Sequence, residues 1–179
     1  MMSHCQDTIV RLARLADAAA ITAIYNQGIE GRNATFDTEL CTTESIATQL
    51  AEKGDKYPTV VVERAGTVVA WASAGPYRAR SCYAGIAQHS VYVERSVRGT
   101  GAGRTALDAL CRVYAERGFW KLLSRIFPEN TASLALHARA GFRVVGVYRR
   151  HGKLDGMWRD AVIVEKLLGE AADDTLQCD

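Results

Sequence analysis

The chain has 179 residues, the length of a single domain, and can bury a sizeable core without disulfide staples. It carries 22 Lys and Arg against 20 Asp and Glu, so the net charge of +2 gives no drive toward nucleic acid or a membrane surface. The five cysteines are odd in number and form no C-x-x-C pair, which argues against a disulfide framework or a zinc site. No apolar run approaches the roughly 18 residues of a membrane span, and residues 1–7 lack a signal pattern, so we expect a cytoplasmic protein.

Hydrophobic periodicity predicts one domain over residues 8–169, with flexible tails at 1–7 and 170–179. Asp17 and Asn130 are expected to cap helices, and Ala65-Gly66 to join two strands in a hairpin. In chain order we expect a strand at 8–12, helices at 17–28 and 43–53, strands at 59–64, 67–75 and 87–93, a helix at 105–117, a strand at 121–127, a helix at 130–141, and strands at 143–148 and 158–168 separated by a long loop. This order predicts a mixed α/β sheet with helices on both faces.

A glycine-rich run, Arg98-Gly99-Thr100-Gly101-Ala102-Gly103-Arg104, separates the strand that ends at Val93 from the helix expected to begin at Thr105. Glycines at every second position let backbone N–H groups turn inward, and the helix directs its positive end at an entering anion. A tight turn that caps the helix is the alternative. The run lacks the Lys-Ser/Thr pair of a Walker loop and the G-x-G-x-x-G spacing of a Rossmann unit. It therefore predicts a pyrophosphate cradle of another kind.

The pattern Arg98-x-x-Gly101-x-Gly103, with Asn130-Thr131-Ala132-Ser133 and Gly141-Phe142 after it, resembles the acetyl-coenzyme A loop of the GNAT acyltransferases. Other segments resemble the branch that N-acetylates phosphinothricin, methionine sulfoximine and arsinothricin, which are toxic glutamate analogues. They are Ile24-Tyr25-Asn26, Ala34-Thr35-Phe36, residues 74–80, Ser90-Val91-Tyr92-Val93, Leu136-His137, and Gly152-Lys153 with Trp158 and Asp160. The resemblance covers Ile9 to about Leu168. It implies a mostly antiparallel sheet with splayed central strands, acetyl-coenzyme A as co-substrate, no metal, and a homodimer.

The same resemblance implies which residues hold the cofactor. Main-chain groups on the splayed strand would bind the pantetheine arm and the thioester oxygen, and Asn130 would bind a pantetheine amide. A simple helix cap is equally compatible with Asn130. The expected cofactor-binding residues are Val91, Tyr92, Val93, Arg98, Gly99, Thr100, Gly101, Ala102, Gly103, Arg104, Asn130 and Ser133.

Two residues are expected to serve the chemistry. Gln88 occupies the position where the family resemblance implies a general-base Glu, and an amide cannot accept a proton at neutral pH. General-base assistance is worth about 10²–10⁴-fold, so we expect slow turnover that rises with pH. His137 lies on an apolar helix face, where a packing role is the alternative, but the match of Leu136-His137 makes it the expected proton carrier. Strand alternation turns His89 away from Gln88 and predicts a packing residue.

A dianionic glutamate analogue needs a cationic clamp that leaves its amine directed at the thioester. Arg78 and Arg80, two apart on an extended segment, are the expected clamp, with solvated surface arginines as the alternative. Phe36 and Tyr83 are expected to form aromatic walls, and Lys153 lies on a loop that closes over the substrate in relatives. Either aromatic could instead be core, and Trp158 could be hairpin packing.

The sequence therefore predicts an acetyl-coenzyme A-dependent N-acetyltransferase that acetylates the α-amine of a small glutamate-analogue toxin and confers resistance. One alternative is an acetyl-coenzyme A binding protein with weak or no catalysis, because of Gln88. The other is a protein N-terminal acetyltransferase, which would need an open peptide groove.

Overall fold

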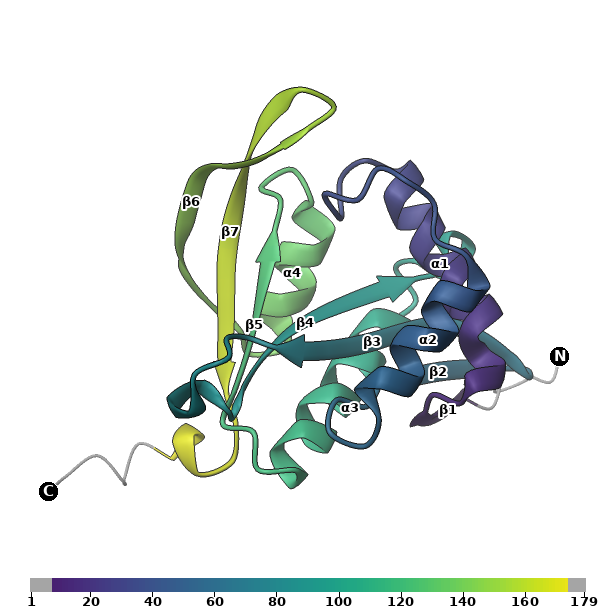
Figure 1. Cartoon of the computed structure of the whole chain (residues 1–179), viewed down its shortest axis with the longest axis horizontal. Helices are drawn as coiled ribbons and strands as arrows, with labels where there is room; N and C mark the ends of the chain where they lie inside the picture. The colour runs from purple at the N-terminus through teal and green to yellow at the C-terminus, as the bar shows by residue number, and fades with distance from the viewer. Residues whose placement is uncertain (1–7, 174–179) are drawn as a thin grey trace, which may run out of the picture.

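The computed structural model describes residues 8–173 (Figure 1). Within them, seven strands form one sheet in the order β1-β2-β3-β4-β5-β7-β6, and every neighbouring pair is antiparallel except β4 and β5. In chain order the elements are β1 (Thr8–Leu12), α1 (Ala18–Glu30), α2 (Thr43–Lys53), β2 (Val60–Arg64), β3 (Thr67–Pro76), β4 (Ile86–Val93), α3 (Ala102–Glu116), β5 (Lys121–Ile126), α4 (Thr131–Arg139), β6 (Arg143–Leu154) and β7 (Met157–Leu167). The expected mixed, mostly antiparallel sheet is confirmed.

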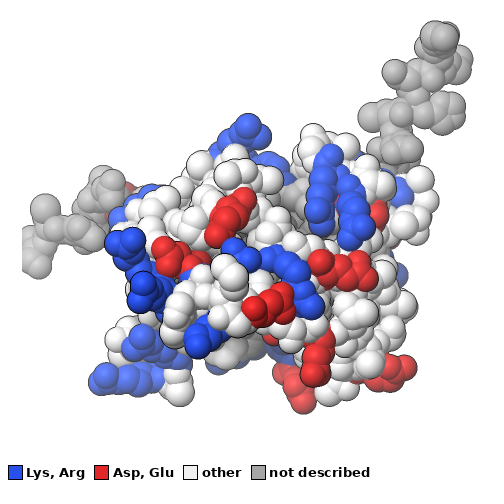
Figure 2. Space-filling view, turned by 90° about the horizontal axis from the view of Figure 1, so that it is seen from above, with Lys and Arg blue, Asp and Glu red and all other residues white. Residues whose placement is uncertain are grey.

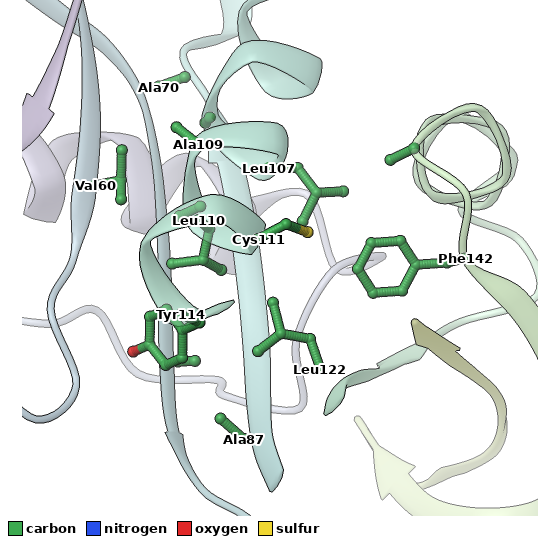
Figure 3. Close-up of a cluster of buried hydrophobic side chains, with 14 of the residues drawn as sticks. Val60, Ala70, Ala87, Leu107, Ala109, Leu110, Cys111, Tyr114, Leu122 and Phe142 are labelled. Carbon is green, nitrogen blue, oxygen red and sulfur yellow. The ribbon is translucent and has the colours of Figure 1, made fainter. Parts of the chain in front are cut away.

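Helices cover both faces of the sheet, because the central strands are apolar on both sides. Val60 and Val62 of β2 face a core built on α3, while Val61 between them faces a second core built on α1 and α2. Figure 3 shows Leu107, Leu110, Cys111 and Tyr114 of α3 packed against Val60, Ala70, Ala87 and Leu122 from the strands. Each fully buried Leu contributes roughly 1.5–3 kcal/mol, so this face anchors the sheet beneath the site.

The parallel strands β4 and β5 pair only at their beginnings. Their register runs through Ile86↔Lys121 and Ala87↔Leu122 and ends at Gln88↔Leu123, although β4 continues to Val93 and β5 to Ile126. Ser124 Oγ still donates a hydrogen bond to the His89 carbonyl at 2.9 Å, and beyond it the strands diverge, as Figure 1 shows. The expected splay of the central strands is therefore present, and it opens the sheet.

Two expectations about element limits need correction. The loop expected between the last two strands is strand: β6 and β7 run on to a two-residue turn at Asp155-Gly156, whose φ angles of 49° and 78° suit a hairpin. The pairing of β6 with β7 is irregular between Tyr148 and Gly152, where the register shifts. The third helix begins at Ala102, because Gly101 adopts a left-handed φ of 88° and ends the loop there.

Asp17 precedes α1 as expected, but its side chain does not cap that helix. It accepts a hydrogen bond from the Arg14 backbone N–H at 2.7 Å and forms an ion pair with Arg11 at 2.7 Å. Asn130 does cap α4, accepting from the Ser133 N–H at 3.1 Å.

The two chain ends and the surface add little to the site. Gly169–Ala172 forms a 3-10 turn at the start of the tail expected at 170–179, and residues 1–7 and 174–179 lie outside the described residues. Figure 2 shows basic and acidic side chains interspersed over one face, in keeping with the small net charge. Between residues 8 and 173, no helix is long and apolar enough to cross a membrane.

Candidate active site

A pocket occupies the gap between β4 and β5, with α4 beside it. It is lined by Ala34, Ser90, Val91, Tyr92, Ser124, Arg125, Ile126, Phe127, Asn130, Ser133 and His137. Because pairing with β5 has stopped at Gln88, one edge of β4 has no neighbouring strand here. Its main-chain groups can therefore bind the amides of an extended ligand. We call this space the cofactor pocket.

The glycine-rich loop leads from β4 into α3 and has the backbone of an anion cradle. Gly99 and Gly101 have φ angles of 79° and 88°, which residues with a side chain rarely adopt. The first intrahelical bond of α3 runs from the Thr105 N–H to the Gly101 carbonyl, so the N–H groups of the preceding turn have no partner within the helix. Gly101 has no side chain to cap them, and the helix dipole favours negative charge there.

Three other loop residues are held by neighbouring elements. Arg98 Nε donates to the Val93 carbonyl at 3.3 Å, and Thr100 Oγ1 accepts from Arg64 at 2.7 Å. Arg104, in the first turn of α3, donates from Nη1 to the Arg139 carbonyl at the end of α4 and forms an ion pair with Asp108 of its own helix at 2.5 Å. These bonds fix the loop before any ligand arrives.

Gly103 permits close packing of α3 on its neighbours. A methyl group there would lie 3.0 Å from Val93 Cγ2 and 3.3 Å from Leu136 Cδ2. The third glycine of the run thus brings α3 against both β4 and α4, which form the walls of the cofactor pocket.

Asn130 combines its capping role with a second contact. While Oδ1 caps α4, Nδ2 donates to the Asn33 carbonyl at 3.1 Å, and so ties α4 to the segment after α1. The residue also lines the cofactor pocket, so the cap and a place at the site coexist.

His137 and His89 form a buried pair behind the cofactor pocket. Each is 2% exposed, and their Nε2 atoms lie 3.0 Å apart. His137 Nδ1 lies 2.8 Å from the Ser133 carbonyl and 3.4 Å from Ser133 Oγ. Burial lowers the pKa of both rings, and the proximity of His137 lowers that of His89 further, so both are neutral at pH 7. The packing expected for His89 is present, but its hydrogen bond to His137 was not foreseen.

The positions of the protons in this pair follow from its partners. A carbonyl only accepts, so His137 Nδ1 must carry a proton, and the neutral ring then accepts at Nε2. His89 must therefore donate from Nε2. The Nδ1 atom of His89 is buried, and the Leu123 backbone raises the pKa of this ring against the larger, lowering effect of burial.

A second pocket of about 290 Å³ adjoins the first, between α1, the segment after it and the far part of β6. We call it the acceptor pocket. It is lined by Tyr25, Ala34, Thr35, Phe36, Gln88, His89, Ser90, Tyr92, Ser124, Arg125, Phe127, His151, Gly152 and Ala161. Its volume lies at the small end of the range for small-molecule sites, which favours a compact ligand.

Charge in the acceptor pocket is positive. Arg125 Nη1 lies 3.2 Å from His151 Nε2, and no Asp or Glu lines either pocket. Burial raises the pKa of Tyr25 to about 12 and also raises that of Tyr92, so both phenols stay protonated. Neither pocket therefore offers a carboxylate or a phenolate as a base.

The expected site residues divide between these pockets and the surface. Gln88 and Phe36 line the acceptor pocket, and within residues 8–173 the Gln88 amide makes no side-chain hydrogen bond. Val93 lies next to Gly103 but is not among the lining residues of either pocket.

Four residues expected to bind the substrate line neither pocket. The Arg78 guanidinium lies over the Tyr77 ring at 5.2 Å, and Arg80 is exposed on the same loop. Tyr83 packs edge-on against Tyr77, and Lys153 lies over the Trp158 ring at 4.6 Å. The arginine clamp stays a prediction.

Sequence reasoning missed Arg125 and His151. A charged residue in the apolar strand 121–127 was the available signal for Arg125. For His151 the only signal was its place in the short basic run 149–153, which could equally be a solvated or a substrate-facing strand end. Within residues 8–173, no cluster of three or more His, Cys, Asp or Glu could hold a metal ion.

Comparison with known proteins agrees with this geometry. The sequence model of the acetyltransferase (GNAT) domain family matches residues 10–163 of this chain. A phosphinothricin N-acetyltransferase of Alcaligenes faecalis is 36% identical over 178 residues, which cover 98% of this chain and 89% of that protein.

Two solved structures are similar over most of their length. A ribosomal-protein-alanine N-acetyltransferase from Brucella melitensis has a TM-score of 0.86 and 36% identity, covering 89% of this chain and 99% of that one. A phosphinothricin acetyltransferase from Sinorhizobium meliloti, in complex with acetyl-coenzyme A, has a TM-score of 0.85 and 29% identity, covering 91% and 89%. The left-handed glycines, the free N–H groups and the open strand edge fit that co-substrate. This chain belongs to the GNAT acetyltransferase family and is an acetyl-coenzyme A-dependent N-acetyltransferase.

Proposed function

We propose that the protein acetylates the α-amine of a small glutamate-analogue toxin, with phosphinothricin as the leading candidate, and thereby confers resistance. The observation that carries this proposal is the acceptor pocket, which is small, has positive charge and lacks carboxylates. A dianionic amino acid matches that size and charge. The names of the Alcaligenes and Sinorhizobium relatives support the same substrate class.

Amide formation from a thioester needs a free amine, a polarised carbonyl and a stabilised leaving thiolate. The loop from Arg98 to Arg104 would hold the pyrophosphate, and the unpaired edge of β4 would bind the pantetheine arm and polarise the thioester oxygen. Arg125 and His151 would bind an acidic group of the acceptor, with Phe36 as an apolar wall. Arg78, Arg80, Tyr83 and Lys153 would reach the acceptor only from outside the described pocket.

Gln88 sets the expected speed of the reaction. It lines the acceptor pocket but cannot take up a proton, and general-base assistance is typically worth about 10²–10⁴-fold. A free α-amine with a pKa of about 8 is partly unprotonated at neutral pH. We therefore expect turnover that is slow at pH 7 and rises toward pH 9.

A thiol-release assay over three acceptors tests the substrate proposal. With acetyl-coenzyme A present, phosphinothricin, methionine sulfoximine and arsinothricin should each release thiol, and mass spectrometry should show one acetyl group on the α-amine. N-acetyl phosphinothricin, which has no free amine, is the matched control and should release none. The proposal fails if none of the three amines is consumed while another amine is.

A protein N-terminal acetyltransferase is the second candidate, favoured by the Brucella relative. A peptide beginning with Ala should be tested as an acceptor in the same assay. A higher kcat/KM for this peptide than for the toxins would identify the protein as an N-terminal acetyltransferase instead. A pure acetyl-coenzyme A binding protein would show thermal stabilisation by acetyl-coenzyme A but no acceptor-dependent thiol.

We also propose that the protein forms a homodimer through β6. This strand is one edge of the sheet, opposite β1, and Val144, Val145, Val147 and Tyr148 on it are each at least half exposed. An open apolar edge favours pairing with another strand. Sedimentation should give a dimer that Val147→Lys converts to monomer, and a monomeric wild type would exclude this interface.

A further inference from the structure

The contact between Arg125 and His151 depends on an irregular stretch of β6. Where the register of β6 with β7 shifts, Arg150 adopts a left-handed φ of 50°. The Arg150 N–H donates to Asp160 Oδ1 of β7 at 2.7 Å, which holds this stretch in place. Such irregularities in a strand re-aim side chains beside a site, and here His151 Nε2 comes to lie 3.2 Å from Arg125 Nη1.

This pair presents only hydrogen-bond donors to the acceptor pocket. A guanidinium has no acceptor atom, so His151 accepts at Nε2, and Nδ1 of its neutral ring carries the proton. Within residues 8–173, neither side chain makes another hydrogen bond. An ionised oxyanion, which only accepts, satisfies such a site, whereas a group with its own N–H leaves donors facing each other.

The charge of Arg125 also has no counter-charge in the part of the chain that the structure describes. Two arginines on neighbouring segments differ from it in this respect. Arg159 forms an ion pair with Glu129 at 3.2 Å, and Arg32 forms one with Asp155 at 3.5 Å. Among the described residues that line the acceptor pocket, Arg125 is the only Arg or Lys, so it is the cation that a ligand there can neutralise.

The pair lies away from the point of acetyl transfer. Gln88 of β4 pairs with Leu123, two residues before Arg125, so Gln88 and Arg125 share one face of the sheet. β7 lies beyond β5, and β6 lies beyond β7 (Figure 1). The contact with His151 of β6 therefore places the guanidinium over β7, where the small side chain of Ala161 leaves room. Strands are about 4.8 Å apart, so β7 is two strand spacings from β4.

This separation decides which end of an amino acid the pair can bind. The α-carboxylate is attached to the same carbon as the reacting amine, so it must stay beside β4, where the thioester is bound. The group at the end of the side chain is the part that can extend over β7. We propose that Arg125 and His151 form a subsite for this distal group and select ionised oxyanions, such as a phosphinate, phosphonate or carboxylate, over neutral groups of the same shape. The proposal rests on the proposed glutamate-analogue acceptor and adds how its distal group is recognised.

Three acceptors of nearly the same shape test this selectivity. Phosphinothricin, methionine sulfone and methionine sulfoximine carry a methyl-bearing tetrahedral centre at the end of the same chain. The first ends in an anion, the second in two neutral acceptor oxygens, and the third in a neutral group with an N–H. The wild-type kcat/KM should fall in that order, with phosphinothricin ahead of the sulfone by about tenfold or more. A wild type that uses the neutral acceptors as well as phosphinothricin would overturn the proposal.

Substitutions of Arg125 show whether its charge is the cause of that preference. Arg125→Met removes the charge but retains an apolar stem. It should lower kcat/KM for phosphinothricin about tenfold or more and change that for the sulfone little, so that the preference disappears. Arg125→Lys, which has the charge without the planar fork, should retain part of it. The ratio between acceptors is measured within one variant, so a loss of folded enzyme cancels. An Arg125→Met enzyme with the wild-type ratio would contradict the subsite.

Two further variants test the geometry of the pair. His151→Leu should weaken the preference for phosphinothricin severalfold, and Asp160→Ala should do the same, because it releases the stretch that holds His151. An undiminished preference in His151→Leu would remove His151 from the subsite. Arg159→Met is the matched control: its charge is already paired with Glu129, so it should change kcat/KM for the three acceptors by the same factor.

Failure of the subsite and failure of the proposed function give different results. If all three compounds are acetylated equally well, the proposed substrate class stands and the subsite falls. If none is acetylated while an Ala peptide is, the proposed substrate falls, and the three compounds are then measured as competitive inhibitors of peptide acetylation. Phosphinothricin should have the lowest inhibition constant in the wild type and lose that advantage in Arg125→Met. Equal constants, or no inhibition by phosphinothricin, would exclude the subsite.

Discussion

Gly152 of β6 packs directly against the ring of Phe36: a methyl group at position 152 would lie 2.7 Å from Phe36 Cε1. Both residues line the acceptor pocket, and Phe36 also meets Phe127 edge-on at 4.8 Å. The far part of the β6–β7 hairpin, which the sequence predicts as a loop, thus forms a wall of the pocket.

Gly152→Ala should therefore push Phe36 into the acceptor pocket. We expect a severalfold rise in KM for the acceptor, an unchanged KM for acetyl-coenzyme A, and a loss of about 1–3 kcal/mol in the free energy of unfolding. Gly146→Ala on the same strand is the control, because nothing lies within 4 Å of the added methyl. Equal KM values for the two variants would show that Phe36 does not shape the pocket.

Gln88→Glu should raise kcat at pH 7 at least about tenfold, since it supplies a base on the acceptor side, where such assistance is worth about 10²–10⁴-fold. The rise of wild-type kcat with pH should flatten in this variant. Steady-state kinetics from pH 6 to 9 give both results. An unchanged kcat would show that no base is needed at position 88.

Arg125→Ala and Arg80→Ala test which cation recognises the acceptor. A charge-assisted hydrogen bond is worth about 1.5–3 kcal/mol, so loss of the true partner should raise KM for phosphinothricin about tenfold or more. We expect this for Arg125, which lines the pocket; for Arg80 the same result would establish the clamp expected from the sequence. Arg112→Ala, on the exposed side of α3, should change neither KM.

Gly101→Ala tests the anion cradle. The φ of 88° costs a side-chain-bearing residue about 1–2 kcal/mol, although the methyl itself meets nothing within 4 Å. If the loop relaxes to avoid that strain, KM for acetyl-coenzyme A should rise about tenfold. Gly118→Ala has the same strain at a φ of 79°, beyond the other end of α3, and should lose similar stability with no change in KM.

Asp17→Asn tests the charge network under β1. Hydrogen bonding to Arg11 lowers the pKa of Asp17 below its ordinary value of 3.8, so the ion pair stabilises the fold above about pH 4. We expect the variant to lose about 2–3 kcal/mol at pH 7. The difference from wild type should disappear as the pH falls through the folded pKa, as urea unfolding at several pH values would show. Glu63→Gln, on the more exposed partner of Arg11, should lose less.

Local sequence patterns predicted an element well where burial of one of its faces gives a clear hydrophobic period. Alternation alone gave the limits of β1, and the helix expected at 43–53 matches α2. Asp17 was placed correctly, but its role was wrong because a partner six residues back in the chain, Arg11, competes for its carboxylate. The turn at Asp155-Gly156 was not predicted, although Asp-Gly is a typical hairpin turn pair.

The site was predictable only where a single segment builds it. The glycine-rich loop is such a segment, and its backbone has the expected form. His89 and His137 are 48 residues apart, on a strand and a helix that meet only through the fold, and no local signal links them. Arg125 and His151 meet in the same way across neighbouring hairpin and strand.

The parting of β4 and β5 also bears on the order of events in catalysis. The two pockets share Ser90, Tyr92 and Ser124 as a common wall, so the thioester and the amine can be bound at the same time. The acetyl group can then pass directly between them, without a covalent acetyl-enzyme intermediate. Initial-rate plots should then intersect, the signature of a ternary complex, rather than run parallel.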